Sequence, residues 1–132
     1  MTRGISPFLM FQNGDAEEAM NFYASLFPGS SIASIERFGP QGPGKEGSVM
    51  TGMLNLSGRP VMFFDSPMKH AFTFTPATSL FVECESPQEV DKLFAALSEN
   101  GQVLMALNEY PFAKRFGWVN DRFGVSWQLR FN

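Results

Sequence analysis

The amino-acid sequence repeats one pattern of elements, with the second copy displaced by 71 residues. Apolar residues spaced i, i+3, i+4 and i+7 define one face of a helix. In the first copy these are Ala19, Phe22, Tyr23 and Leu26, and in the second copy they are Val90, Leu93, Phe94 and Leu97. The same displacement aligns the strand-like run at 8–12 with the run at 79–83. Because one offset aligns both a strand and a helix, we expect two copies of a single supersecondary unit.

The helix boundaries are marked by capping residues. Asp15 and Ser86 stand where N-cap side chains are expected, and Pro87 occupies the first position of the second helix. Gly101 follows the last turn of that helix and is the predicted C′ residue, which favours a left-handed backbone.

Three strand-like runs follow each helix. They span 31–38, 48–56 and 59–66 in the first copy, and 102–110, 116–121 and 125–131 in the second. Each copy is therefore a βαβββ unit, the first over approximately residues 4–66 and the second over approximately 77–131. We predict an α+β fold with mainly antiparallel strands, in a single domain of residues 1–132.

Composition excludes several classes of protein. A formal net charge of −3 argues against a nucleic-acid partner, which requires a basic face. No uninterrupted apolar stretch is long enough to span a membrane, and the first residues lack the pattern of a signal peptide. Cys84 is the one cysteine, so no internal disulfide can form. These features favour a cytoplasmic protein with neither a membrane nor a nucleic acid as partner.

Several stretches resemble the vicinal oxygen chelate superfamily, which includes glyoxalases and bleomycin-resistance proteins. They are "AMNFYASLFP" at 19–28, "GPGKEGSVM" at 42–50, "FTFTPATSLFVECES" at 72–86 and "WVNDRFGVSWQ" at 118–128. Within the superfamily the chain is similar to the PhnB-like branch, often labelled 3-demethylubiquinone-9 3-methyltransferase-like. The resemblance implies two curved sheets that form cups, a ligand inside the cups and a homodimer.

The resemblance also implies four positions at which active members of the superfamily hold a metal ion. They fall on Phe8 or Pro7, on Met62 or Phe64, on Ser79 and on Gln128. Phenylalanine offers no donor atom, and a divalent ion needs several well-placed N, O or S donors to offset its dehydration. We therefore expect neither a metal nor another cofactor at these positions.

A ligand site built from the same positions is the alternative. Gln128 lies among apolar residues of the last strand, and its family position turns it toward the cup, where it and Ser79 would be polar anchors. The predicted ligand contacts are Phe8, Met10, Met62, Phe64, Ser79, Phe81, Trp118 and Gln128. The same aromatic residues could instead fill the interior of a curved sheet with no ligand.

Other side chains have both a chemical and a structural interpretation. His70 and Glu83 are the candidate acid/base residues; His70 could equally be a solvated loop residue, and Glu83 could pair with Arg130 or lie at a strand end in water. Asp121 is a third candidate, although an Asp before a strand typically stabilises a turn. Cys84 lies in an apolar strand and is interpreted as a core residue.

The loop "GPQGPGK" at 39–45 has the spacing of a phosphate-binding loop. Its two prolines remove backbone donors and a strand follows it, so a hairpin loop that could cover the mouth of the cup is the favoured interpretation.

Three functions remain open. The first is metal-independent binding of a small, partly apolar molecule. The second is an enzyme of unknown reaction that uses Glu83, His70 or Asp121, and the third is an interaction module whose cups are filled. Methyl transfer is not expected, because the sequence lacks the glycine-rich strand-to-helix turn common to S-adenosylmethionine enzymes.

Overall fold

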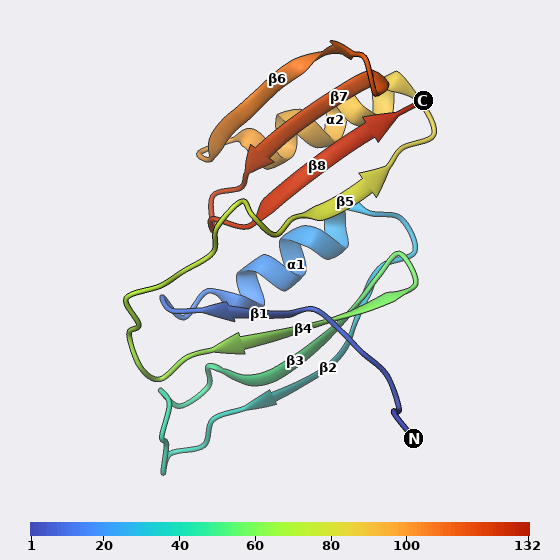
Figure 1. Cartoon of the computed structure of the whole chain (residues 1–132). Coiled ribbons are helices and arrows are strands. Elements are labelled where there is room, and N and C mark those ends of the chain that lie inside the picture. Colours follow the sequence, from blue (N-terminus) through green and yellow to red (C-terminus); the bar gives the residue numbers. More distant parts are fainter. The chain divides into compact units, whose positions relative to one another are not determined.

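The computed structural model describes residues 1–132, and the chain divides into two compact units, Met1–Phe72 and Thr73–Asn132 (Figure 1). The first unit contains β1 (Phe8–Phe11), α1 (Ala16–Leu26), β2 (Ser31–Arg37), β3 (Val49–Leu56) and β4 (Arg59–Asp65). The second contains β5 (Leu80–Glu83), α2 (Pro87–Ser98), β6 (Gln102–Tyr110), β7 (Ala113–Asn120) and β8 (Ser126–Phe131). The prediction of an α+β fold made of two βαβββ units is confirmed. The prediction that the units form one domain stays a prediction.

Both units have the same sheet topology. The strand orders are β1-β4-β3-β2 and β5-β8-β7-β6, so the first strand of each unit lies at an edge beside the last strand. The β1–β4 and β5–β8 pairs are parallel, and all other pairs are antiparallel. The duplication read from the sequence therefore extends to the order and direction of the strands.

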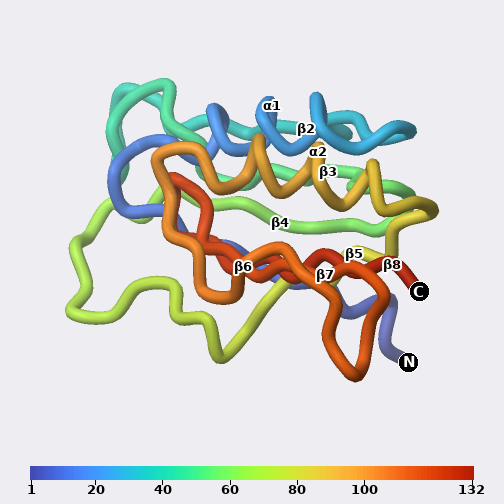
Figure 2. The backbone as a smooth tube through the Cα atoms, turned by 90° about the horizontal axis from the view of Figure 1, so that it is seen from above, coloured from blue at the N-terminus to red at the C-terminus, as the bar shows by residue number.

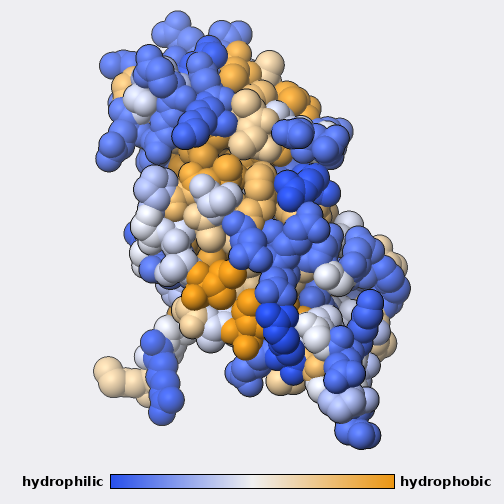
Figure 3. All heavy atoms as spheres, turned by 180° about the vertical axis from the view of Figure 1, so that it is seen from behind, coloured by the Kyte–Doolittle hydropathy of each residue, from blue (hydrophilic) through white to orange (hydrophobic).

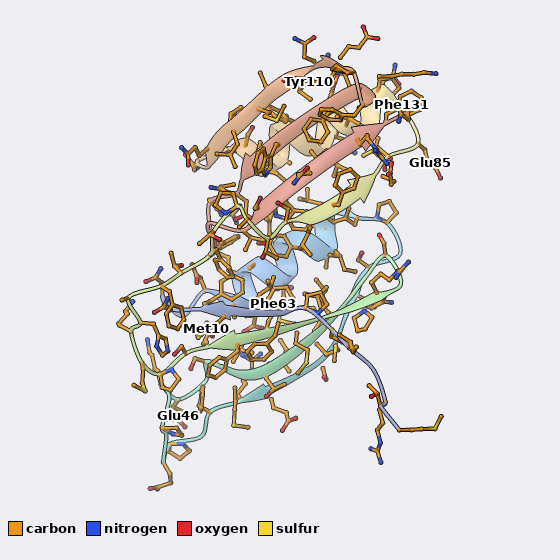
Figure 4. All side chains as sticks on the ribbon, in the orientation of Figure 1. Met10, Glu46, Phe63, Glu85, Tyr110 and Phe131 are labelled. Carbon is orange, nitrogen blue, oxygen red and sulfur yellow. The ribbon has the colours of Figure 1, made fainter.

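In the first unit, α1 packs on one face of the sheet. The Phe63 ring of β4 lies 6.0 Å from that of Tyr23 and stacks on Phe11 at 5.6 Å. Gly52 of β3 lies so close to the helix that an added Cβ would be 2.7 Å from the sulfur of Met20. Met10 of β1 and Phe63 of β4 are labelled in Figure 4. Because neighbouring residues of a strand point to opposite faces, Met62 and Phe64 lie on the side away from α1.

In the second unit, α2 covers one face of the sheet in the same way (Figure 2). An added Cβ on Gly117 of β7 would be 2.5 Å from the Phe94 ring, which fixes the odd-numbered side of β7 as the helix side. Val119, Trp127 and Leu129 are buried there with the α2 residues Val90, Leu93 and Leu97. Tyr110 of β6 and Phe131 of β8 can be followed in Figure 4.

The two helices begin differently. The prediction of Ser86 as N-cap is confirmed, because its Oγ accepts a hydrogen bond of 3.1 Å from Glu89 N. Asp15 occupies the N-cap position of α1 but makes no side-chain cap hydrogen bond. Asp65, at the end of β4, instead accepts a bond of 3.0 Å from Ala16 N. A buried carboxylate from a distant strand thus supplies the cap that the local sequence assigned to Asp15.

The prediction of Gly101 as the C′ residue of α2 is wrong. Asn100 takes the left-handed conformation, with a φ of 58°. Gly101 is required for another reason, because an added Cβ would lie 2.2 Å from the backbone oxygen of Asn120. Asparagine tolerates the left-handed region, which leaves the glycine free for this close approach. No helix in the structure has both the length and the apolar character needed to cross a membrane.

Candidate functional site

Each sheet has a face turned away from its helix, which we call the distal face. In the second unit the distal face carries Ser79, Phe81, Glu83, Trp118, Ser126, Gln128 and Arg130. Strand register defines this set, because Gln128 lies opposite both Phe81 and Trp118, and directly opposed residues share a face. The four ligand contacts predicted in this half of the chain, Ser79, Phe81, Trp118 and Gln128, are therefore on one side of one sheet.

Four of these side chains form a hydrogen-bonded cluster, which we call the serine cluster: Ser79, Trp118, Ser126 and Gln128. The two serine hydroxyls are 2.6 Å apart. Gln128 Nε2 donates to Ser79 Oγ at 3.2 Å, and Trp118 Nε1 donates to Ser126 Oγ at 2.8 Å. Ser126 is 2% exposed, whereas the other three are half-buried. The cluster therefore lies at the boundary between the sheet interior and its distal surface.

A count of protons shows what the serine cluster can offer to a ligand. Its three bonds use one indole proton, one amide proton and one hydroxyl proton. The two serines supply two hydroxyl protons, so one always remains. Rotating the Gln128 amide would make its oxygen an acceptor and would leave N–H protons free instead. In either arrangement the cluster keeps an unused donor.

A buried hydrogen-bond acceptor without a partner lies next to the serine cluster, on the residue paired with Ser126. Asn120 of β7 lies opposite Ser126, and its Oδ1 is buried without a hydrogen-bond partner. An unpaired buried polar atom is rare, because its desolvation is not compensated. This distal face thus has at least one donor and, in Asn120 Oδ1, a buried acceptor that the protein itself does not use.

Glu83 and Arg130 form an ion pair beside the serine cluster. The guanidinium donates to both carboxylate oxygens and lies 5.0 Å above the Phe81 ring. The Glu83 hydrogen bonds raise the pKa of Arg130, so this residue stays cationic. Of the alternatives for Glu83, the structure therefore shows the pair with Arg130. Phe81, 49% exposed, has one ring face occupied by the cation.

The part of the first unit's distal face that β1 and β4 form is apolar. Phe8 pairs with Met62 and Met10 pairs with Phe64, so the four predicted contacts of this half share one face. The rings of Phe8 and Phe64 stack at 5.8 Å, and Phe38 lies 6.5 Å from Phe64. No side chain of these four can donate a hydrogen bond.

The residues at the superfamily's metal positions do not fit a divalent ion. No group of three or more His, Cys, Asp or Glu side chains lies close enough together to bind a metal. The Gln128 amide donates to Ser79, and the candidates in the first unit are Phe, Pro or Met. Hard cations prefer oxygen ligands and zinc prefers His and Cys, and neither set is present.

The remaining candidates have structural contacts. Asp121 is buried and accepts bonds from Phe123 N, Val125 N and Trp127 Nε1 at 2.9, 3.0 and 2.9 Å. These bonds fix the turn between β7 and β8, as the structural interpretation expected.

His70 is exposed and stacks on Phe72 at 4.8 Å, with Nε2 3.3 Å from Ser66 Oγ. Cys84 is buried, and burial together with Glu89 raises the pKa of its thiol to about 12. A thiol of this kind is not a ready nucleophile at neutral pH.

Sequence reasoning missed Ser126 and the polar role of Trp118. Ser126 has the same parity as Gln128 along β8, so alternation could have placed it on the distal face. Trp118 was expected to make apolar contacts, and its indole N–H is what links β7 to the cluster.

Comparison with known proteins identifies the family. The model of the family described as 3-demethylubiquinone-9 3-methyltransferase matches residues 3–130. The chain belongs to this family, the PhnB-like branch of the vicinal oxygen chelate superfamily.

Solved structures and curated relatives agree with this assignment. A PhnB protein from Bacillus cereus is 53% identical, with a TM-score of 0.94 over 98% of this chain and 100% of that one. Protein PA1353 from Pseudomonas aeruginosa is 28% identical, with a TM-score of 0.78 over 99% and 98%. Protein YjdN from Escherichia coli is 25% identical over 95% of this chain and 92% of its own length. The fosfomycin resistance protein FosX from Listeria monocytogenes shares the fold, with a TM-score of 0.63 at 10% identity over 98% and 90%.

Proposed function

We propose that the second unit binds a small, uncharged, partly apolar molecule at the serine cluster without a metal ion. The observation that carries this proposal is the hydrogen bond from Gln128 Nε2 to Ser79 Oγ. It joins two positions that would hold a metal in other members of the superfamily, and it joins them as donor and acceptor. An amide and a hydroxyl bonded in this way suit hydrogen bonding to a neutral ligand.

The chemistry of the surrounding groups defines the ligand. The spare proton of the cluster calls for an acceptor, such as a carbonyl oxygen, and Asn120 Oδ1 calls for a donor. Trp118 and Phe81 supply aromatic surface beside these groups. A flat molecule with a carbonyl oxygen and an N–H or O–H group would satisfy all of them. Leaving such buried groups unpaired costs about 1–3 kcal/mol each, which gives the site its selectivity.

We propose binding and not methyl transfer, although the family description names a methyltransferase. The side chains of the serine cluster are uncharged hydrogen-bond donors and acceptors. The sequence also has no glycine-rich turn of the kind that holds S-adenosylmethionine in the common methyltransferase fold.

A fragment screen by thermal shift tests the proposal. We expect aromatic carbonyl compounds to stabilise the wild-type protein and to lose most of this effect with Gln128→Leu, because a ligand that binds only the folded state raises the unfolding temperature. Gln88→Leu is the matched control, since Gln88 is exposed on α2 and makes no contact with the cluster. A screen without hits, or hits that Gln128→Leu leaves unchanged, would contradict the proposal.

We also propose that the protein forms a homodimer. β1 and β5 are edge strands, and each exposes a large aromatic side chain, 54% for Phe8 and 49% for Phe81. Exposed apolar edges favour association in place of solvation. Light scattering coupled to gel filtration tests this, and a monomer at micromolar concentration would contradict it.

A further inference from the structure

We propose that a polar cleft in the first unit is a separate binding site for a small oxyanion, a phosphate or a carboxylate. The cleft has a volume of about 720 Å³ and is lined by three loop segments. They are residues 12–14 between β1 and α1, residues 45–48 before β3, and residues 65–67 with Lys69 at and after the end of β4. The carboxyl ends of the parallel strands β1 and β4 meet here, which is where ligands commonly bind in sheets with parallel strands.

Two lysines without a carboxylate partner give the cleft its chemistry. Lys69 Nζ donates to the backbone oxygen of Gln12 and, at 2.8 Å, to Asn13 Oδ1, both of which are neutral acceptors. Lys45 comes from the loop on the other side of the cleft and forms no salt bridge. Each ammonium group carries three donor protons, so Lys69 retains one and Lys45 retains all three.

The cleft is lined by two carboxylates, Asp65 and Glu46, so its formal charge is zero, but the two carboxylates are not equally placed to oppose an anion. Asp65 accepts hydrogen bonds from Ala16 N at 3.0 Å and Val49 N at 2.8 Å, so its two oxygens are directed into the protein. Glu46 also lines the cleft, and its position in the β2–β3 loop is labelled in Figure 4. Glu17 on α1 is neutralised by Arg37, with 2.7 Å between Oε1 and the guanidinium. Glu46 is therefore the lining carboxylate whose oxygens are exposed and can repel an anion at close range, whereas the oxygens of Asp65 are already bonded to backbone N–H groups.

The loops that present the lysines are held in place. The Gln12 amide donates to Phe72 O at 2.8 Å and accepts from His70 N at 2.6 Å, which fixes the segment containing Lys69. Arg37 donates to Gly47 O at 3.1 Å and so fastens the other loop to the sheet. A site with fixed donors loses little entropy when it binds a ligand.

This cleft also explains part of the "GPQGPGK" pattern. Its prolines rule out a cradle of backbone N–H groups, but its lysine is the residue that faces the cleft. The anion would therefore be bound by two lysine side chains from different loops, with no helix N-terminus involved, since Asp65 already caps α1.

Titration with inorganic phosphate and, separately, with acetate tests the proposal. The backbone amide NMR signals of Gly14, Gly47 and Ser48 report the binding. We expect saturable shifts at millimolar anion that weaken as NaCl is raised. Lys45→Met and Lys69→Met should each weaken binding about 10- to 150-fold, the range for loss of one charge-assisted bond, while Glu46→Gln strengthens it. Lys92→Met, at an exposed position of α2 in the second unit, is the control. Preference for phosphate or for acetate identifies the anion class.

Shifts that do not saturate below about 50 mM anion, which corresponds to binding weaker than about 2 kcal/mol, would overturn the proposal. Equal binding by wild type, Lys45→Met and Glu46→Gln would overturn it as well. Lys69→Met could loosen its loop, so Lys45→Met and Glu46→Gln, which change exposed side chains, decide the result. The cleft lies wholly within the first unit, so failure here is distinct from failure of the proposed function, which rests on the second.

Discussion

The two units use one backbone plan to present two different surfaces. The 71-residue displacement and the strand register make Phe8 equivalent to Ser79, and Phe64 equivalent to Gln128. In the first unit this pair is an aromatic stack of 5.8 Å, and in the second it is a hydrogen bond of 3.2 Å. The same positions of a duplicated sheet therefore hold an aromatic contact in one copy and a hydrogen-bonded polar cluster in the other.

The exposed large hydrophobic residues are divided unequally between the two units. Figure 3 shows hydrophobic side chains that reach the surface among hydrophilic ones. The large hydrophobic residues exposed in the first unit are Met1, Ile5, Phe8, Met50, Met68 and Phe72. In the second unit the exposed large hydrophobic residues are Phe81, Val103 and Phe112, and Phe81 is partly covered by Arg130. The first unit therefore exposes more large hydrophobic side chains than the second.

Core truncation gives the largest expected effect and tests whether the units are equally well packed. Phe63 and Trp127 occupy equivalent positions and are 0% and 1% exposed. We expect Phe63→Ala and Trp127→Ala each to lower the free energy of unfolding by about 3–5 kcal/mol. Urea denaturation measures this. A loss below about 1 kcal/mol in one unit would show that its core is not packed as described.

Replacement of the buried carboxylates gives the next largest expected loss in the free energy of unfolding. Asp65 accepts hydrogen bonds from two backbone N–H groups, whereas Asp121 accepts them from two backbone N–H groups and an indole N–H. We expect Asp121→Ala to lower the free energy of unfolding by about 3–5 kcal/mol and Asp65→Ala by about 2–4 kcal/mol, because each leaves buried donors unpaired. Denaturation of the two variants side by side gives the ranking. The reverse order would contradict the hydrogen-bond count.

A substitution in the serine cluster should change ligand affinity more than the free energy of unfolding. Ser79→Ala removes one hydroxyl but leaves the apolar core of the sheet intact. For a carbonyl ligand found by screening we expect a 5- to 30-fold loss of affinity, equivalent to about 1–2 kcal/mol. Calorimetric titration measures it, with the equivalent change Phe8→Ala in the first unit as the control. Equal losses from both variants would remove the distinction between the units.

The smallest effect concerns a surface ion pair in the first unit and its pH dependence. The hydrogen bond from Arg37 lowers the pKa of Glu17 below its usual value of 4.5. A lowered folded-state pKa contributes stability above pH 4.5, and this contribution is lost as the pH falls through the lowered value. We expect Glu17→Gln to flatten this acid limb slightly, since the pair is exposed. Thermal unfolding between pH 6 and pH 3 tests this, and a steeper limb in Glu17→Gln would contradict it.

Local patterns in the sequence predicted much of the fold. The apolar spacing located both helices, and the single offset predicted that the units would share one topology. Strand alternation and the family positions also placed Phe8 with Phe64 and Ser79 with Gln128. These features depend on residues close together in sequence or on a repeat, so one chain is enough to show them.

The pair of Glu83 and Arg130 was among the alternatives that the sequence offered, but other long-range hydrogen bonds were beyond sequence reasoning. Asp65 caps a helix 49 residues away, and nothing near Asp15 indicates that its own cap bond is replaced. Ser126 and Trp118 meet Ser79 only because strand register brings β5, β7 and β8 together. Asn100 takes the left-handed conformation that was predicted for Gly101, while Gly101 lies against the backbone of Asn120. Only tertiary packing creates this close approach.

The central claim is that Gln128 and Ser79 bind a neutral ligand and do not coordinate a metal. Thermal unfolding with zinc, nickel or manganese at millimolar concentration, with and without a chelator, tests it most directly. We predict no stabilisation by any of the three ions, in the wild-type protein or in Gln128→Leu. A rise of several degrees that the chelator reverses and Gln128→Leu abolishes would contradict the account.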